Sequence, residues 1–399
     1  MRYLRSVGIF TIAQAAAAIL AFFYALIAAR LLGVVQFGLF QALMGIYGLL
    51  AAFSMPLNLA TVHCVGISAP DKRRCVAGEF LRLAIYVSAL CAIAVAFFSP
   101  AIMQVLRTGS VWPVLWLAAL LVTTALLTTF FGILQGIQSY GQFSIAKVAH
   151  PLMTLILGSL LMLWGKQVSG AMAGYTMGMT FVLIYLFIQR DLYEWGKGFQ
   201  HIRDELRSIA WIIATFGVLL LMDNAPIIFA RAYLTEEQSG TFGALYSLRN
   251  VVWAFAFAVS FPLYAHLISG EKGRATVMQA LILISALAIV FIAAGWICPQ
   301  WLFRTLFGEP FIGAADYMVP YGFSLWLQMA AMIFMFYQVA KGMMRAFHLI
   351  LPAVVLLLML LVFKTQVTDL IVAQMISAGS YFIVAGIAFW RKRRKLPIP

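Results

Sequence analysis

The feature that most restricts the fold of this sequence is a series of long apolar stretches, such as residues 276–297, which contain no Asp, Glu, Lys or Arg. A helix that crosses a bilayer needs about 20 consecutive, mostly apolar residues, because the hydrocarbon core is roughly 30 Å thick. The stretches are continuous rather than alternating, which favours helices over barrel strands. The chain is 64% hydrophobic and 10% charged, whereas soluble proteins average about 25% charged residues. We therefore expect an all-α integral membrane protein.

The apolar stretches predict about 12 transmembrane helices. Two pairs of them, the fifth with the sixth and the eleventh with the twelfth, are separated only by the short polar breaks Lys166-Gln167 and 364–369. The predicted spans cover residues 8–28, 38–62, 79–98, 113–134, 146–165, 170–189, 209–231, 243–268, 276–297, 316–340, 349–364 and 370–390.

The Lys and Arg residues are distributed unevenly between the two sides of the predicted bundle. Nineteen of the 27, Lys147 among them, lie at the termini and in the even-numbered connections, and six lie in the odd-numbered connections, with Arg82 and Arg249 assigned to neither side. Because cytoplasmic loops carry the excess of Lys and Arg, we expect a multi-pass membrane protein with both termini in the cytoplasm. The net charge of +14 follows from this topology, so it predicts contact with membrane lipids and no nucleic-acid partner.

The sequence repeats itself at an offset of about half its length. Residues 29–43 read ARLLGVVQFGLFQAL and residues 230–248 read ARAYLTEEQSGTFGALYSL, so that Ala-Arg is followed by Phe-Gly in both. Six spans per half predict two parallel six-helix repeats, related by an axis along the membrane normal, around a central cleft. We expect the glycines of the two Phe-Gly pairs, Gly38 and Gly243, to allow a tight turn or a close backbone approach.

The repeat predicts two domains, residues 1–207 and residues 208–399. The first is a six-helix bundle that includes a linker helix at about 190–207. The second is a six-helix bundle followed by a basic cytoplasmic tail, Arg391-Lys392-Arg393-Arg394-Lys395.

The sequence lacks the motifs of the common catalytic and cofactor sites. It has no GxxxxGK[ST] motif for nucleotide binding and no HExxH motif for zinc. Its four cysteines form no CxxC pair, and four of its five histidines, at positions 63, 150, 201, 266 and 348, lie close to span ends. We therefore expect a protein that is not an enzyme and that uses no metal or cofactor.

Two charged residues lie well inside predicted spans, where a charge costs about 2.5–3.5 kcal/mol even on the most permissive scale. Asp223 precedes Arg231 by about 12 Å of helix, and Arg249 follows Gly243 by about 9 Å. Similar depths on consecutive spans allow the two side chains to pair. Either they form a structural ion pair between the seventh and eighth helices, or Arg249 binds an anionic group while Asp223 orients it or exchanges a proton.

Arg30 and Arg231 end the first and seventh spans on the predicted outer face. Either they anchor the helix at the interface with the charged head in the headgroup region, or they line the outer mouth of the cleft with positive charge. The first half has no equivalent of the Asp223–Arg249 pair, so a substrate cavity is predicted to be cationic. Arginine forms bidentate hydrogen bonds with phosphate, which favours a phosphate or diphosphate substrate. The candidate substrate-binding residues are Arg249, Asp223, Arg30 and Arg231.

Several segments resemble the polysaccharide transporter family of lipid-linked oligosaccharide flippases (Wzx-like), part of the multidrug/oligosaccharidyl-lipid/polysaccharide exporter superfamily. The resemblance rests on residues 29–43, on 222–224 with 243–248, on Gly132-Ile133-Leu134-Gln135-Gly136, and on 306–311. The chain departs from the family pattern in three respects. It is somewhat short, it has Phe40 where tyrosine is common, and its Gly-Ala-Leu-Tyr carries one extra residue.

The resemblance implies a flippase that moves a polyprenyl-diphosphate-linked oligosaccharide across the inner membrane by alternating access. The product would serve lipopolysaccharide or exopolysaccharide biosynthesis at the cell surface. Arg249 would be a cavity arginine, and Asp223 would be the acid of the seventh span. The implied partners are the lipid-linked substrate and membrane lipids, and further partners would be a polysaccharide polymerase and the export machinery.

Four alternatives to oligosaccharide transport stay open. A drug or cation antiporter of the same superfamily needs carboxylates in its cleft, and Asp223 is the single deeply placed one. A lipid II flippase usually has two further spans and more cavity arginines. A membrane-embedded polysaccharide polymerase or ligase generally carries a sizeable outer loop, which this sequence lacks. A non-transporting scaffold explains neither the duplication nor the charged pair.

Overall fold

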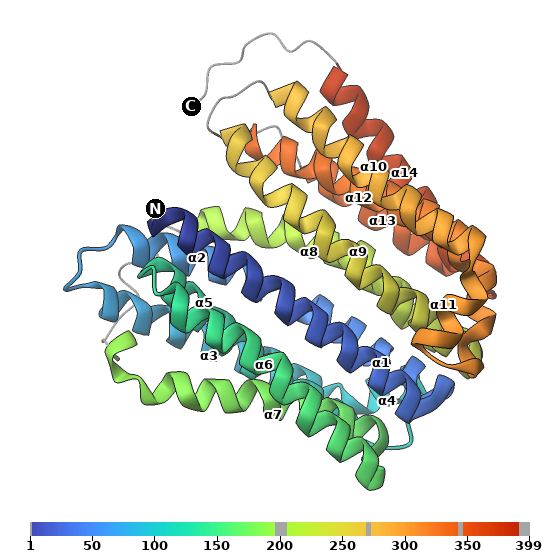
Figure 1. Ribbon diagram of the computed structural model, residues 1–399, viewed down its shortest axis with the longest axis horizontal. Coiled ribbons are helices and arrows are strands. Elements are labelled where there is room, and N and C mark those ends of the chain that lie inside the picture. Colours follow the sequence, from blue (N-terminus) through green and yellow to red (C-terminus); the bar gives the residue numbers. More distant parts are fainter. Residues whose placement is uncertain (1, 196–205, 269–272, 342–345, 391–399) are drawn as a thin grey trace. The chain divides into compact units, whose positions relative to one another are not determined.

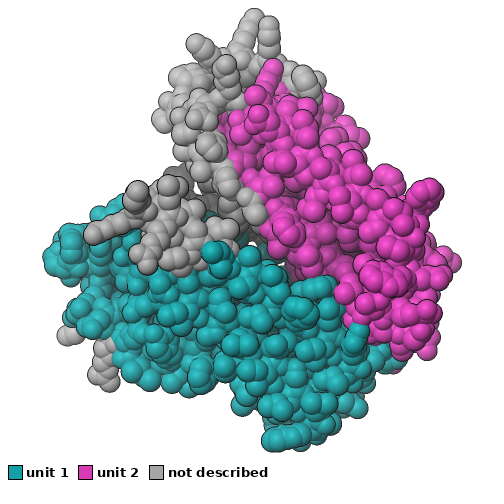
Figure 2. All heavy atoms as spheres, in the orientation of Figure 1, with its two compact units in different colours: residues 1–220 teal, residues 221–399 magenta. Residues whose placement is uncertain are grey.

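The computed structural model describes residues 2–195, 206–268, 273–341 and 346–390 (Figure 1). Within these ranges the chain is helical and contains no β-strand, which confirms the all-α prediction. It divides into two compact units, residues 1–220 and residues 221–399 (Figure 2). Residues 196–205 of the predicted linker helix, and the basic tail at 391–399, lie outside the described residues.

The first unit is organised around helix α5 (Trp112–Gly136). This helix packs against α2 (Ser54–Ile67), α3 (Arg73–Phe97) and α7 (Gln167–Ile188). Its buried side chains are mostly apolar and occur on every turn, as expected for a helix enclosed by others. The unit is completed by α1 (Arg2–Leu50) and α6 (Tyr140–Leu161), which pack against each other and against α7.

The second unit is organised in the same way around helix α12 (Met318–Ala340). This helix packs against α9 (Glu236–Ile268), α10 (Gly273–Ile297) and α14 (Val367–Trp390), and α14 also packs against α13 (Ala346–Val362). Helix α8 (Leu206–Tyr233) enters this unit at Leu221.

The packing partners repeat from one unit to the other. Helices α5 and α12 each hold the fourth predicted span of their half, and each contacts the second, third and sixth spans of that half. The predicted duplication is therefore present in the tertiary contacts as well as in the sequence.

Each predicted span lies in helical segments of the structure, apart from one or two residues at the ends of the spans 79–98, 170–189 and 349–364. In the described residues, seven stretches are long and apolar enough to cross a membrane, and Ile350–Val362 is a shorter apolar helix. Two of the seven, Ile12–Ile67 and Tyr140–Ile188, each contain two predicted spans. The spans of the second pair are separated by a π-helical turn at Met162–Lys166, where Gly165 has a φ of 76°. The break predicted at Lys166-Gln167 is thus confirmed.

The two junctions that share the Ala-Arg and Phe-Gly pattern turn in different ways. In the first junction the turn is made by Gly33, with φ 69° and ψ 174°. This backbone region is open essentially to glycine alone. Of the two roles predicted for Gly38, a tight turn or a close backbone approach, the turn is therefore wrong. In the second junction α9 begins with a capping box, in which the Thr235 hydroxyl accepts from the Gln238 N–H and the Gln238 amide oxygen accepts from the Thr235 N–H, both at 3.2 Å.

Each half contains a short helix that the sequence interpretation missed. Helix α4 (Ser99–Leu106) follows α3, and α11 (Pro299–Leu306) follows α10. Both have proline in the first turn, a position at which the missing N–H has no intrahelical partner anyway. They are too short to span a bilayer, so a search for apolar stretches of about 20 residues does not detect them.

The glycines of the Gly132–Gly136 motif have a packing role. A Cβ on Gly132 would lie 2.8 Å from the Thr61 Cβ and 2.9 Å from the Asn58 carbonyl oxygen, and one on Gly136 would lie 2.9 Å from the Val65 Cβ. The motif therefore allows α5 to approach α2 closely, as small residues do between membrane helices.

Candidate functional site

The candidate site lies in the second unit, where α8 carries Asp223 and α9 carries Arg249. The two side chains form an ion pair, which confirms the pairing predicted from their depths. Arg249 is 1% exposed, and the Asp223 side chain is 16% exposed. The pair brings a positive and a negative charge into a largely apolar bundle, so each charge compensates the other.

Aromatic rings on α9 enclose the Arg249 guanidinium. Its central carbon lies 4.7 Å from the ring centroid of Tyr246 and 5.3 Å from that of Trp253. These rings lie three residues before and four residues after Arg249, so all three side chains share one face of the helix. A cation positioned over an aromatic face is attracted by the ring quadrupole. The rings therefore stabilise the charge on the sides that Asp223 does not reach.

Polar contacts hold the ring and the carboxylate in place. The Tyr246 hydroxyl donates to the side-chain oxygen of Asn224 at 2.6 Å, which ties α9 to α8 next to Asp223. One guanidinium nitrogen of Arg249 also donates to the Asn250 side-chain oxygen at 3.4 Å. From α12, the Tyr321 hydroxyl interacts electrostatically with Arg249, and its ring packs against Phe242 at 5.8 Å. Three helices thus converge on one guanidinium.

Sequence reasoning missed part of this site. Trp253 and Tyr321 were not singled out, although Trp253 could have been found from its spacing to Arg249 on the helix. Tyr321 lies on a different span, and nothing in the sequence places it beside Arg249. Tyr246 and Asn224 were noticed as parts of family-like segments, but their hydrogen bond was not predicted.

The other two candidate residues do not share the environment of Arg249. Arg231, near the end of α8, is 2% exposed and donates to the Glu236 carboxylate at 2.9 Å. This ion pair crosses the short connection between α8 and α9. Arg30 lies on α1 in the first unit and is exposed. The two arginines occupy matching places in the repeat, but only Arg231 is buried.

In the described part of the chain, no group of three or more His, Cys, Asp and Glu side chains is arranged to hold a metal ion. The chemistry that the Asp223–Arg249 pair can supply is recognition of a charged ligand. An anion that approached Arg249 would compete with Asp223, and an organic cation would compete with Arg249 for the Asp223 carboxylate.

The part of the chain that carries this ion pair matches a known protein family. Residues 3–268, which include both Asp223 and Arg249, match the family model "Polysaccharide biosynthesis protein". The chain belongs to this family. A search of curated protein sequences finds no match to the chain.

Solved structures of membrane transporters share the fold. The lipid II flippase MurJ, in an inward closed conformation, matches with a TM-score of 0.78 and 12% identity over 95% of this chain and 87% of MurJ. An inward-facing multidrug resistance MATE family transporter matches with a TM-score of 0.72 and 15% identity over 93% and 94% of the two chains. A mutant of the Vibrio cholerae MATE transporter VcmN matches with a TM-score of 0.69 and 13% identity over 96% of each chain. The chain therefore has the fold of the multidrug/oligosaccharidyl-lipid/polysaccharide exporter superfamily.

Proposed function

We propose that the protein is a flippase of the inner membrane that moves polyprenyl-diphosphate-linked oligosaccharides by alternating access, with both termini in the cytoplasm. The observation that carries the proposal is the family match over residues 3–268, which spans the buried Asp223–Arg249 pair. The MurJ structure, named as a lipid II flippase, supports a lipid-linked substrate because it covers nearly the whole chain.

The Asp223–Arg249 pair supports a specific role in this function. Arg249 is buried and compensated by Asp223, and a diphosphate offers more acceptor oxygens than one carboxylate does. Substrate binding would then exchange the Asp223–Arg249 contact for a contact between Arg249 and the diphosphate. Asp223 would act as a reversible stand-in for the substrate anion, and its release would favour the loaded state of the second unit.

The proposal is tested in cells that lack the gene. The deletion strain should lose surface polysaccharide and accumulate lipid-linked repeat units on the cytoplasmic side, and the wild-type chain should reverse both effects. A downstream polysaccharide polymerase and export machinery would use the flipped product, so free polymer should also fall. A deletion strain with unchanged surface glycan and unchanged lipid-linked intermediates would contradict the proposal.

The ion pair needs a variant that separates folding from function. Removing one partner of a buried pair costs about 3–5 kcal/mol, whereas replacing both by apolar residues is often neutral. The double variant Asp223→Ala/Arg249→Met should therefore accumulate at the wild-type level and still fail to restore polysaccharide. A double variant that restores it fully would assign the pair a purely structural role.

A second candidate function is drug or organic-cation antiport. It is supported by the similarity to multidrug resistance MATE transporters and by the partly exposed carboxylate of Asp223. In that case the deletion strain would keep its surface polysaccharide and become sensitive to cationic drugs. Asp223→Asn would then reproduce the sensitivity of the deletion.

A further inference from the structure

Helix α6 places two basic side chains inside the first unit. Lys147 lies about 10 Å along this helix from its start at Tyr140, and His150 follows three residues later on the same face. Both side chains are half-buried. The sequence interpretation counted Lys147 with a cytoplasmic connection, at the start of the predicted span 146–165, and α6 begins seven residues before it.

The imidazole of His150 has unmet hydrogen-bonding capacity. Both ring nitrogens are buried, and neither has a hydrogen-bond partner among the described residues. A neutral imidazole offers one donor and one acceptor, and a protonated imidazole offers two donors. Buried polar side-chain atoms usually have partners, so an unpartnered imidazole indicates a place where a further group can bind.

Lys147 is a half-buried cation without a counter-ion among the described residues. Its ammonium lies 5.2 Å from the ring centroid of Phe131, and no carboxylate pairs with it in the described part of the chain. The buried Arg249 of the second unit, in contrast, is paired with Asp223. Charges inside membrane proteins are generally paired or face a functional site, and Lys147 has only an aromatic ring.

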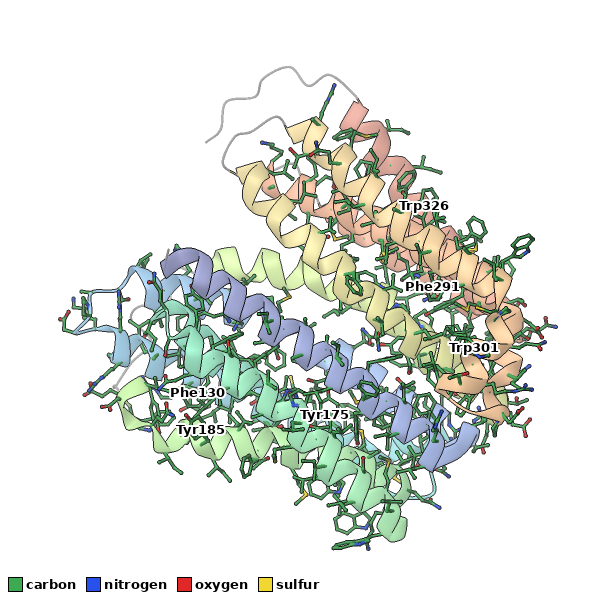
Figure 3. All side chains as sticks on the ribbon, viewed as in Figure 1. Phe130, Tyr175, Tyr185, Phe291, Trp301 and Trp326 are labelled. Atoms are coloured by element: carbon green, nitrogen blue, oxygen red, sulfur yellow. The ribbon has the colours of Figure 1, made fainter. Side chains whose placement is uncertain are left out.

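The helices around Lys147 and His150 contribute tyrosines rather than acids. Tyr175, which is labelled in Figure 3, lies on α7. Its ring is 6.0 Å from the His150 ring and also packs against Tyr24 and Tyr47 of α1. The Tyr24 hydroxyl donates to the Ala171 carbonyl at 2.7 Å, and the Tyr47 hydroxyl bonds with that of Thr124, on α5, at 2.9 Å. The Tyr175 hydroxyl makes no hydrogen bond within the described residues. An ammonium, an imidazole and a phenol are thus available as donors, with no carboxylate beside them.

We propose that Lys147, His150 and Tyr175 form a second anion site, which binds the phosphate or diphosphate group of a lipid within the first unit. Lysine is a common phosphate ligand as a point charge, and imidazole and phenol donors complete the contacts of the phosphate oxygens. The identity of the occupant rests on the proposed function. The phosphate belongs either to the lipid-linked substrate or to an anionic phospholipid.

The site is tested by binding of farnesyl diphosphate to the purified full chain in phosphatidylcholine nanodiscs. Lys147→Met should weaken the affinity at least tenfold, because it removes the charge and keeps the length of the side chain. Lys147→Arg should bind within about threefold of wild type, and His150→Leu should lie between the two. Unchanged affinity in Lys147→Met would overturn the proposal.

A second lysine provides the matched control. The ammonium of Lys364 also lies over an aromatic ring, 4.4 Å from the centroid of Tyr233, but in the second unit and next to α14. Lys364→Met makes the same chemical change and should leave the affinity for farnesyl diphosphate unchanged. An equal loss in Lys364→Met and Lys147→Met would show that the effect is one of net charge, and it would overturn the site.

Two further comparisons separate the sources of the phosphate and the two proposals. If phosphatidylglycerol in the nanodisc competes with farnesyl diphosphate in wild type and in Lys147→Arg, but does not change the residual binding of Lys147→Met, the site accepts a phospholipid headgroup. Absence of competition in wild type assigns the site to the substrate. The binding and transport measurements test the two proposals separately. If Lys147→Met loses binding but the wild-type protein moves no lipid-linked oligosaccharide, the anion site stands and the proposed function is wrong. If Lys147→Met binds like wild type and the wild-type protein moves the oligosaccharide, the proposed function stands and the anion site is wrong.

Discussion

The two units place equivalent helices in equivalent contacts, but they treat buried positive charge differently. In the second unit Arg249 is held by Asp223 and by the rings of Tyr246 and Trp253. In the first unit Lys147 lies over Phe131, and no carboxylate of the described residues forms an ion pair with it. A duplicated fold preserves which helices touch, because that depends on the shape of many side chains. The charge at a given position depends on one residue, so the halves diverge there first.

The largest expected effect comes from removing Arg249, with the same change at Lys147 for comparison. Arg249→Met alone leaves the mostly buried carboxylate of Asp223 uncompensated, so we expect a loss of about 3–5 kcal/mol in the free energy of unfolding. Lys147→Met leaves no unpaired acid behind and should not lower the stability. Thermal unfolding of the two variants in detergent checks this difference. Equal losses in both would show that the charges of the two units play the same role.

The second expected effect is a loss of stability where the fifth and sixth spans of a half pack against each other. A Cβ on Gly174, on α7, would lie 2.1 Å from the Cα of Gly158, on α6, whereas a Cβ on Gly379, on α14, would meet no atom within 4 Å. Gly174→Ala should therefore destabilise the protein by about 1–3 kcal/mol, the usual cost of overpacking.

Gly379→Ala is the matched control for this substitution, since it makes the same change on the sixth span of the other half. It should be neutral or slightly stabilising, because alanine is the better helix former. The midpoints of thermal unfolding of the two variants measure the difference. A loss in Gly379→Ala as large as that in Gly174→Ala would mean that the two seams are packed alike.

A smaller effect is expected at the two junctions that share the Ala-Arg and Phe-Gly pattern. Gly33→Ala forces a side chain into a glycine-only backbone region, which costs about 1–3 kcal/mol. Thr235→Ala removes the capping box of α9, which costs about 1 kcal/mol. Unfolding measurements that rank Thr235→Ala above Gly33→Ala would contradict this order.

Much of the fold could be predicted because the membrane makes the pattern simple. A membrane span is recognised by about 20 consecutive apolar residues. The rise per residue of a helix converts sequence distance into depth in the membrane, and the similar depths of Asp223 and Arg249 predicted their pairing. The turn at Gly33 was not predicted, because a single glycine in an apolar stretch does not indicate its φ angle. The short helices α4 and α11 were not predicted, because they do not have the length of a membrane span.

The parts of the site that sequence could not supply depend on contacts between distant spans. Tyr321 reaches Arg249 from α12, and Tyr175 reaches His150 from α7. Lys147 was counted as a topology signal, as a lysine near the end of a span ordinarily is. The start of α6 at Tyr140 shows that the helix begins about two turns before this lysine.

The most direct test of the proposed function uses purified protein in liposomes with a fluorescent polyprenyl-diphosphate oligosaccharide in one leaflet. The loss of fluorescence to a membrane-impermeant quencher reports movement across the bilayer. The wild-type chain should move the labelled lipid, and the folded Asp223→Ala/Arg249→Met variant should move it at the rate of empty liposomes. A folded wild-type chain that leaves the labelled lipid in its original leaflet would contradict the account.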